Sequence, residues 1–140
     1  MTRVSMSMDL KVPADKVWEM IGSFNALPDW HPAVEKSEIE GDGKGSIRTL
    51  HLAGGGTIRE RLERIDDEDM VYSYSIVSGP LPVINYVSTL RLHESEDGKG
   101  CTVEWESDFQ PMGVPENDAV NAITGVYEAG LKNLQKMFGG

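Results

Sequence analysis

Hydrophobic and polar residues alternate along most of the chain between residues 34 and 109, in short runs separated by turn-forming segments. A period of two is typical of β-strands that bury one face and expose the other. The separators GDGKG, AGGG and ESEDGKG are rich in glycine and aspartate, which favour hairpin turns. The pattern predicts an antiparallel meander with strands at 34–40, 46–53, 57–66, 70–78, 83–94 and 100–109.

The pattern changes on either side of this meander. Residues 3–11 alternate like a further strand, and the following segment PADKVWEMIGSF spaces its apolar residues three or four apart, as a short helix does. The segment ALPDWHPAV, with two prolines, predicts a second short helix or a tight loop. From residue 116 to 138 apolar residues recur at helical spacing, which predicts a long terminal helix of ~30 Å or more.

These elements define an α+β fold, in which residues 1–140 form a single domain. We expect a curved antiparallel sheet of about seven strands, two short helices between the first and second strands, and a long helix that covers one face of the sheet. A twisted sheet does not pack evenly along a nearly straight helix. The architecture therefore predicts a pocket between the two.

One carboxylate interrupts the apolar face of its strand. In TIRERLERID, residues 57–66, strand alternation places Ile58, Glu60 and Leu62 on the same face. A buried carboxylate has to pair, become neutral or meet water. The same alternation turns Arg48 inward on the neighbouring strand, where a guanidinium can pair with Glu60. Two interpretations stay open: a structural clasp beside a cavity water, or a site for chemistry or for a polar ligand group.

Strand alternation also places other residues on the inner face, Ile84 and Tyr86 among them. Trp30 and His31 lie in the irregular segment before the second strand, where they could form a rim or lid, or simply a surface-packed aromatic and a helix-ending histidine. The residues predicted to contact a ligand are Trp30, Leu50, Tyr72, Tyr74, Ser88, Trp105, Phe109 and Tyr127.

Composition and charge narrow the classes of partner. The net charge is −10 with acidic residues spread along the chain, which argues against nucleic acid and anionic membranes as partners. The three histidines and one cysteine show no metal-ligand spacing, and no phosphate-binding loop is present, so we expect neither a metal nor a cofactor. The single Cys101 fits a reducing compartment, and residues 1–12 alternate rather than form an apolar signal, so we expect a cytoplasmic protein.

The chain resembles the START-like (SRPBCC) superfamily of helix-grip proteins, which includes polyketide cyclase/dehydrase relatives and the birch-pollen-allergen fold. The resemblance rests on PADKVWEMIGSF, on the WHP segment, and on a meander followed by a long helix. Within it, GSIRTL, TIRERLERID and NYVSTL are similar to lachrymatory-factor-synthase-like members. That resemblance implies catalytic roles for Arg48, Glu60 and Tyr86.

Three functions are compatible with these observations. The first is cofactor-free proton transfer on a small, mainly apolar molecule with a polar group, by an isomerase, cyclase, dehydratase or lyase. In this function Arg48 would orient the ligand, Glu60 would move a proton and Tyr86 would donate a hydrogen bond. The second is a carrier or sensor that uses the same pocket. The third is an interaction module whose pocket is incidental, and all three are compatible with a monomer or a homodimer.

Overall fold

The computed structural model describes residues 1–139 and contains seven strands, two α-helices before the meander and one long helix after it. Strands β2, β4 and β6 and helix α3 have the bounds that the sequence predicts, and the other strands differ by one or two residues. The elements are β1 (Thr2–Leu10), α1 (Ala14–Ile21), the 3-10 helix η1 (Phe24–Ala26), α2 (Leu27–Trp30), β2 (Val34–Glu40), β3 (Ile47–Leu52), β4 (Thr57–Asp66), β5 (Val71–Ser78), β6 (Val83–Glu94), β7 (Cys101–Pro111) and α3 (Glu116–Phe138).

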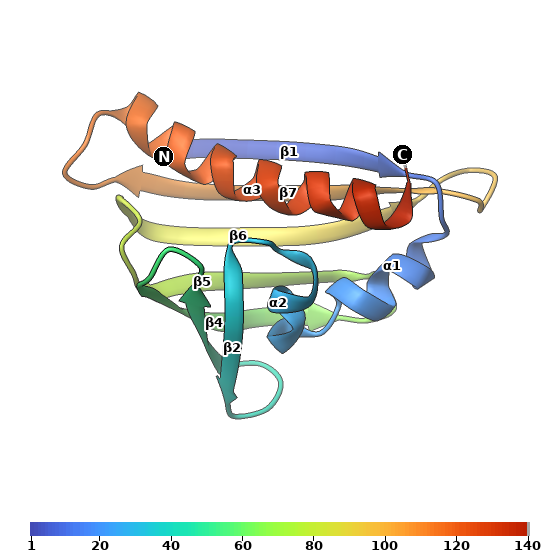
Figure 1. The fold of residues 1–140 in the computed structure, drawn as a ribbon, viewed down its shortest axis with the longest axis horizontal. Helices are drawn as coiled ribbons and strands as arrows, with labels where there is room; N and C mark the ends of the chain where they lie inside the picture. The colour runs from blue at the N-terminus through green and yellow to red at the C-terminus, as the bar shows by residue number, and fades with distance from the viewer. Residues whose placement is uncertain (140) are drawn as a thin grey trace.

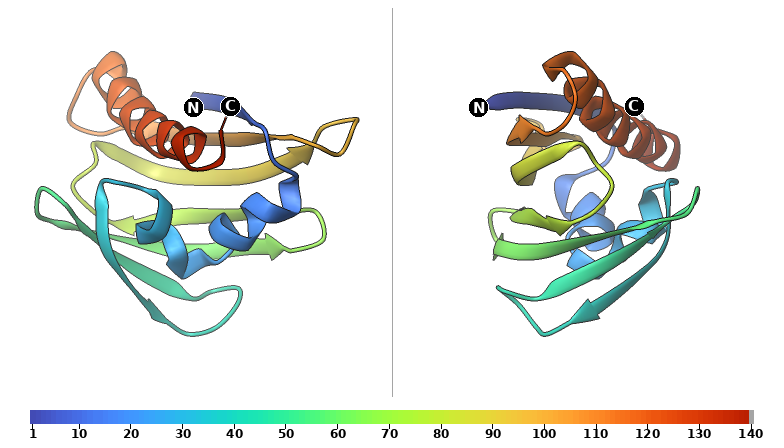
Figure 2. Two further views of the ribbon diagram at one scale, coloured as in Figure 1. Left: turned by 45° about the vertical axis from the view of Figure 1, so that its right-hand side comes forward. Right: turned by 90° about the vertical axis from the view of Figure 1, so that its left-hand side faces the viewer.

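All seven strands form one antiparallel sheet in the order β1-β7-β6-β5-β4-β3-β2. Helix α3 lies along β1 and β7, and α1 and α2 lie over the same face of the sheet, in front of β4 and β5 (Figure 1). The sheet curls strongly from β7 to β2 (Figure 2). This arrangement confirms the predicted α+β helix-grip fold.

Gly130 lets helix α3 approach the sheet and α2 closely. A Cβ atom at this position would lie 2.8 Å from Cδ2 of His31 and 3.0 Å from the rings of Trp105 and Trp30. The helix buries its apolar stripe here, and Tyr127, Leu131 and neighbouring residues are inaccessible to solvent. The helix is therefore packed closely against a buried aromatic cluster. Within residues 1–139, no helix is long and apolar enough to cross a membrane.

The predicted inward position of Ile84 is wrong. A β-bulge interrupts the pairing of β6 with β7 between Ile84 and Val87, and Asn85 has a φ of 54°. Two consecutive residues, Ile84 and Asn85, therefore face solvent, and Val83 takes the buried position. Simple alternation places Tyr86 correctly because Tyr86 is in phase with Ser88 and Leu90, which are buried on the same strand.

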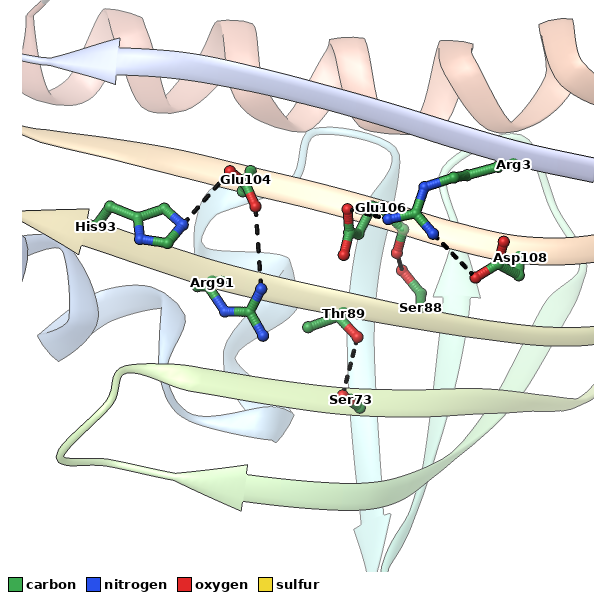
Figure 3. A network of polar contacts seen from close by, with 9 residues as sticks. All are labelled: Arg3, Ser73, Ser88, Thr89, Arg91, His93, Glu104, Glu106 and Asp108. Carbon is green, nitrogen blue, oxygen red and sulfur yellow. Dashed lines mark hydrogen bonds and ion pairs between the residues drawn. The ribbon is translucent and has the colours of Figure 1, made fainter.

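The outer face of the sheet carries exposed ion pairs (Figure 3). Arg3 on β1 contacts Glu106 at 2.7 Å and Asp108 at 3.4 Å, both on the neighbouring strand β7. Glu104 lies 4.0 Å from Arg91 of β6. These side chains are polar and partly exposed, as strand alternation predicts for the face away from the helix.

Candidate functional site

A cavity of about 330 Å³ lies between the inner face of the sheet and helices α2 and α3. Its walls are mainly apolar, and the exposed turn at Ala53 to Gly55, between β3 and β4, lies at its edge. The polar side chains on the wall are those of Glu60, Tyr74, Tyr86 and His31. Apolar side chains that line it include Leu27, Leu50, Ile58, Ile76, Leu81 and Ile123.

A buried ion pair supports one side of this cavity. Arg48 and Glu60 are direct partners across β3 and β4, and Nε of Arg48 donates to Oε1 of Glu60 at 2.8 Å. Nη2 lies 2.7 Å from the same oxygen, at an angle too poor for a hydrogen bond. Nη1 donates to the backbone carbonyl of Phe24 in η1 at 2.5 Å. The sequence thus brings Arg48 and Glu60 together, as predicted.

Aromatic rings complete the surroundings of the guanidinium. The Cζ atom of Arg48 lies 4.0 Å from the ring centroid of Phe24 and 4.9 Å from that of Tyr74. The ring centroid of Tyr72 lies 5.8 Å from the same atom. The side chain of Arg48 is 0% exposed and does not line the cavity. Arg48 therefore lies behind the cavity wall. The member of the ion pair that faces the cavity is Glu60.

The charged side chains of Arg48 and Glu60 stabilise each other where solvent is largely excluded. Burial raises the pKa of Glu60, and the Coulombic attraction and hydrogen bond of Arg48 offset part of this shift. Burial is the largest single influence on Arg48 and acts to lower its pKa, but the Glu60 carboxylate together with Tyr72 and Tyr74 more than offsets it, so the pKa of Arg48 is raised. Both contacts of Arg48 with Glu60 go to Oε1. The other carboxylate oxygen, Oε2, receives no side-chain hydrogen bond from residues 1–139.

Tyr86 connects the cavity wall to a chain of hydroxyl groups. Its hydroxyl lies 2.5 Å from that of Tyr127, which lies 2.8 Å from Oγ of Ser88. Ser88 in turn donates to the backbone carbonyl of Glu106 at 3.0 Å. Burial raises the pKa of Tyr86 well above its ordinary value and that of Tyr127 to about 12. Both tyrosines are therefore protonated at neutral pH.

His31 is part of the cavity wall, although its ring nitrogens are occupied. Its Nε2 lies 2.8 Å from the carbonyl of Val126 on α3, and its Nδ1 accepts the backbone N–H of Ala33 at 3.2 Å. The proton therefore sits on Nε2 and is donated to the carbonyl. Burial lowers the pKa of His31, which keeps the ring neutral. His31 ends helix α2, as one of the two interpretations states, and both it and Trp30, which that interpretation places at the surface, are buried.

The predicted ligand-contacting residues divide into two groups. Leu50, Tyr74 and Trp105 line the cavity, together with Glu60 and Tyr86. The others lie in the buried layer around it rather than on its wall, and Trp30 packs its ring 5.4 Å from that of Trp105 instead of forming a rim. This second group consists of Trp30, Tyr72, Ser88, Phe109 and Tyr127.

Several lining residues were not predicted. Strand alternation does place Ile58 on the inward face with Glu60, and Ile76 is the partner of Glu60 on β5, but neither was named as a ligand contact. Leu81 and the 53–55 turn belong to loops, for which no periodic signal exists. In the described part of the chain, no three histidine, cysteine or acidic side chains gather as ligands for a metal ion.

Comparison with known proteins identifies the family. The family model for polyketide cyclase / dehydrase and lipid transport matches residues 1–139. The abscisic acid receptor PYL2 of Arabidopsis thaliana is 31% identical, with 91% of this chain and 71% of the receptor aligned. The carrot (Daucus carota subsp. sativus) isoallergen Dau c 1.0401 is 33% identical over 75% of this chain and 79% of the isoallergen. The chain spans about two thirds of the length of the Arabidopsis abscisic acid receptors PYL7 and PYL6, 63% and 65% respectively.

Solved structures agree in fold over nearly the whole chain. The protein XoxI of Bacillus cereus superposes with a TM-score of 0.94 at 39% identity, covering 99% of this chain and 96% of XoxI. An uncharacterised protein of Bacillus thuringiensis gives a TM-score of 0.93 at 39% identity, covering 98% of both chains. The match of the family model and these similarities together show that the chain belongs to the polyketide cyclase/dehydrase and lipid transport family, within the START-like superfamily.

Proposed function

We propose that this protein binds a small, mainly apolar molecule in the cavity between the sheet and helix α3. The observation that carries the proposal is a cavity of about 330 Å³ with apolar walls and one carboxylate, Glu60, held in place from behind. Small-molecule sites have this character: concave, mostly apolar, with a few placed polar groups. Two relatives named as abscisic acid receptors support a small ligand for this chain as well.

An incidental pocket accounts for these features less well. Protein interiors are close-packed, and an unfilled apolar space costs stability in proportion to its volume. A buried ion pair is often no more stabilising than apolar residues of the same size. A chain that needed only a stable surface for a partner would gain from filling the space and replacing Arg48 and Glu60.

Titration with a neutral fluorescent probe tests the binding proposal. N-phenyl-1-naphthylamine, whose emission rises in apolar surroundings, should show saturable enhancement with the protein. Val126→Phe places a larger side chain on the cavity wall and should weaken binding by roughly tenfold or more. Val120→Phe is the matched control, because Val120 is also half-buried on α3 but does not line the cavity.

The control should change the dissociation constant by no more than about twofold. Absence of saturable enhancement, or equal losses in the two variants, would contradict binding in this cavity. Thermal unfolding of both variants establishes that each is folded before the titrations are compared.

Proton transfer by Glu60 is the second candidate function. It is favoured by the position of its carboxyl, with Oε1 held by Arg48, no side-chain partner for Oε2, and a raised pKa suited to acid/base chemistry. Arg48 would act as a positioning residue for Glu60, since it does not reach the cavity. Such an enzyme would be a cofactor-free isomerase, cyclase or lyase.

Hydrogen–deuterium exchange at an acidic carbon tests this candidate. The apolar bicyclic ketone 2-tetralone in D₂O loses protons beside its carbonyl to any base that reaches them, and NMR follows the loss. Wild-type protein should accelerate exchange by roughly 10²–10⁴-fold relative to Glu60→Gln, which keeps the shape and removes the base. Equal rates in both proteins, with the ketone shown to be bound, would leave binding as the function and remove the catalytic role of Glu60.

A further inference from the structure

The carboxylate on the cavity wall offers one free hydrogen-bond acceptor. Arg48 approaches Oε1 of Glu60 with both Nε and Nη2, and no side chain of the described chain donates to Oε2. The guanidinium itself is enclosed by Phe24 and Tyr74 and is not part of the wall. A bound molecule would therefore meet the acceptor oxygen of the pair and not its cation.

The chain of hydroxyl groups makes Tyr86 a second acceptor. A backbone carbonyl only accepts, so the contact between Ser88 and the Glu106 carbonyl uses the single proton of Ser88. Ser88 then accepts a hydrogen bond from Tyr127, and this bond uses the one hydroxyl hydrogen of Tyr127. Tyr86 has to donate to Tyr127, which leaves only lone pairs of Tyr86 for the cavity. This direction differs from the donor role that the sequence suggests for Tyr86.

The other polar groups of the wall supply a single donor. Trp105 donates its Nε1–H to the hydroxyl of Tyr74 at 3.1 Å, so Trp105 has no further hydrogen-bond donor for a ligand. His31 has both ring nitrogens committed to backbone groups of Val126 and Ala33. The proton of Tyr74 has no acceptor among the side chains of residues 1–139, and it is the one side-chain donor free to meet a ligand.

We infer that this cavity selects ligands that present a hydroxyl or amine hydrogen-bond donor on an apolar body, and that it rejects carboxylates of the same shape. A donor group satisfies Oε2 of Glu60 or the oxygen of Tyr86, whereas a carboxylate would face like charge and leave both acceptors unpaired. The inference rests on the proposed binding function and names its ligand class.

Three probes with one bicyclic body test the selectivity. They are 2-naphthol, which carries a donor, 2-methoxynaphthalene, which carries only an acceptor, and 2-naphthoate, which carries a negative charge. Calorimetric or NMR titrations at about pH 8 keep the naphthol neutral and favour the ionised form of Glu60. We expect 2-naphthol to bind roughly tenfold more tightly than 2-methoxynaphthalene, and 2-naphthoate to bind roughly a hundredfold more weakly than 2-naphthol.

Two variants connect the selectivity to the named atoms. Glu60→Gln lets the amide oxygen continue to accept from Arg48 and turns the amide N–H groups toward the cavity, so the advantage of 2-naphthol over 2-naphthoate should fall by roughly tenfold or more. Tyr86→Phe removes the second acceptor with no change of charge and should reduce the preference for 2-naphthol over 2-methoxynaphthalene by roughly threefold. Val120→Phe, away from the cavity, should preserve the wild-type order of the three probes.

The outcomes separate this inference from the function on which it rests. Saturable binding with 2-naphthoate tightest, or with equal affinities for 2-naphthol and 2-methoxynaphthalene, overturns the inference and leaves the binding function standing. If none of the three probes nor N-phenyl-1-naphthylamine binds, the binding function itself fails. Should Glu60→Gln not fold, Tyr86→Phe decides: an unchanged preference in that folded variant contradicts the assigned direction of the hydroxyl chain.

Discussion

The sheet carries ion pairs on both of its faces, and the two faces use them differently. On the outer face, the side chain of Arg3 is 56% exposed and that of its partner Glu106 is 25% exposed. On the inner face, Arg48 is 0% exposed, Glu60 is 7% exposed, and aromatic rings surround the guanidinium. An exposed pair gains little because water competes for both charges, whereas a buried pair is costly to assemble and more costly to break. The inner pair therefore makes better sense as a device that sets the polarity of the cavity than as a source of stability.

Removal of the inner cation should give the largest effect. Arg48→Met leaves Glu60 buried without a partner, and we expect it to lower the free energy of unfolding by about 3–5 kcal/mol at neutral pH. Urea unfolding followed by tryptophan fluorescence measures this loss.

Replacement of both partners is the control for this prediction. The double variant Arg48→Met/Glu60→Leu removes the charge together with its partner, and its stability should return to within about 1–2 kcal/mol of the wild type. A loss below about 1 kcal/mol in Arg48→Met alone would make the inner pair equivalent to an exposed one, and the contrast between the faces would disappear.

The two glycines of helix α3 extend the comparison to its inner and outer sides. Gly130→Ala puts a Cβ 2.8 Å from His31 and 3.0 Å from Trp105, both held by packing. We expect overpacking to cost about 1–3 kcal/mol and to exceed the gain in helix propensity of about 1 kcal/mol. Gly125→Ala, with no atom within 4 Å, should instead stabilise by about 0.5–1 kcal/mol. Thermal unfolding distinguishes the two, and equal shifts in the two variants would show that α3 is not held tightly on its inner side.

The fold was predictable because its signals are local and repeated. Strand β4 alternates from Thr57 to Leu62, before its register shifts between Leu62 and Arg64, and helix α3 keeps its apolar spacing over 23 residues, so each reveals its type without tertiary information. Ile84 was misplaced because the bulge and the positive φ at Asn85 depend on pairing with β7, which no pattern within β6 records.

The site was predictable only as far as strand alternation reaches. Alternation identified Arg48 and Glu60 as inward neighbours, which their direct pairing on β3 and β4 confirms. It indicates which face a residue occupies but not how near the cavity it lies. Tyr72 and Tyr74 share a face, yet only Tyr74 is on the cavity wall, because η1 brings Phe24 over Arg48 and Tyr72.

Two glutamates should titrate in opposite directions from their ordinary value. Burial raises the pKa of Glu60, with partial compensation from Arg48, whereas the hydrogen bond from His51 and the charge of Lys36 lower the pKa of the exposed Glu38. A raised pKa means that the contribution of Glu60 to stability is fully present below about 4.5 and is lost as the pH rises through the folded value. The contribution of Glu38 has the opposite sign: it is present above about 4.5 and is lost as the pH falls through the folded value.

Carboxyl-carbon NMR titration measures both values in one experiment. Unfolding curves of Glu60→Gln and Glu38→Gln across the acidic range then give the two signs, since each variant should lose one of the two pH dependences. If Glu60 titrates below the ordinary glutamate value, then Arg48 outweighs burial and the carboxylate is the stable form on the cavity wall.

The smallest effect is expected at the outer pair. Arg3→Ala removes the contacts with Glu106 and Asp108, and because these side chains are partly exposed we expect a loss of less than about 1 kcal/mol in urea unfolding. About 1 M salt shortens the Debye length to about 3 Å and should shrink this loss further. Salt should leave the loss in Arg48→Met nearly unchanged, because the guanidinium is 0% exposed and is enclosed by Phe24, Tyr72 and Tyr74. The salt response of the two arginine variants, more than the size of either loss, therefore decides whether the inner pair is screened from solvent as its burial implies.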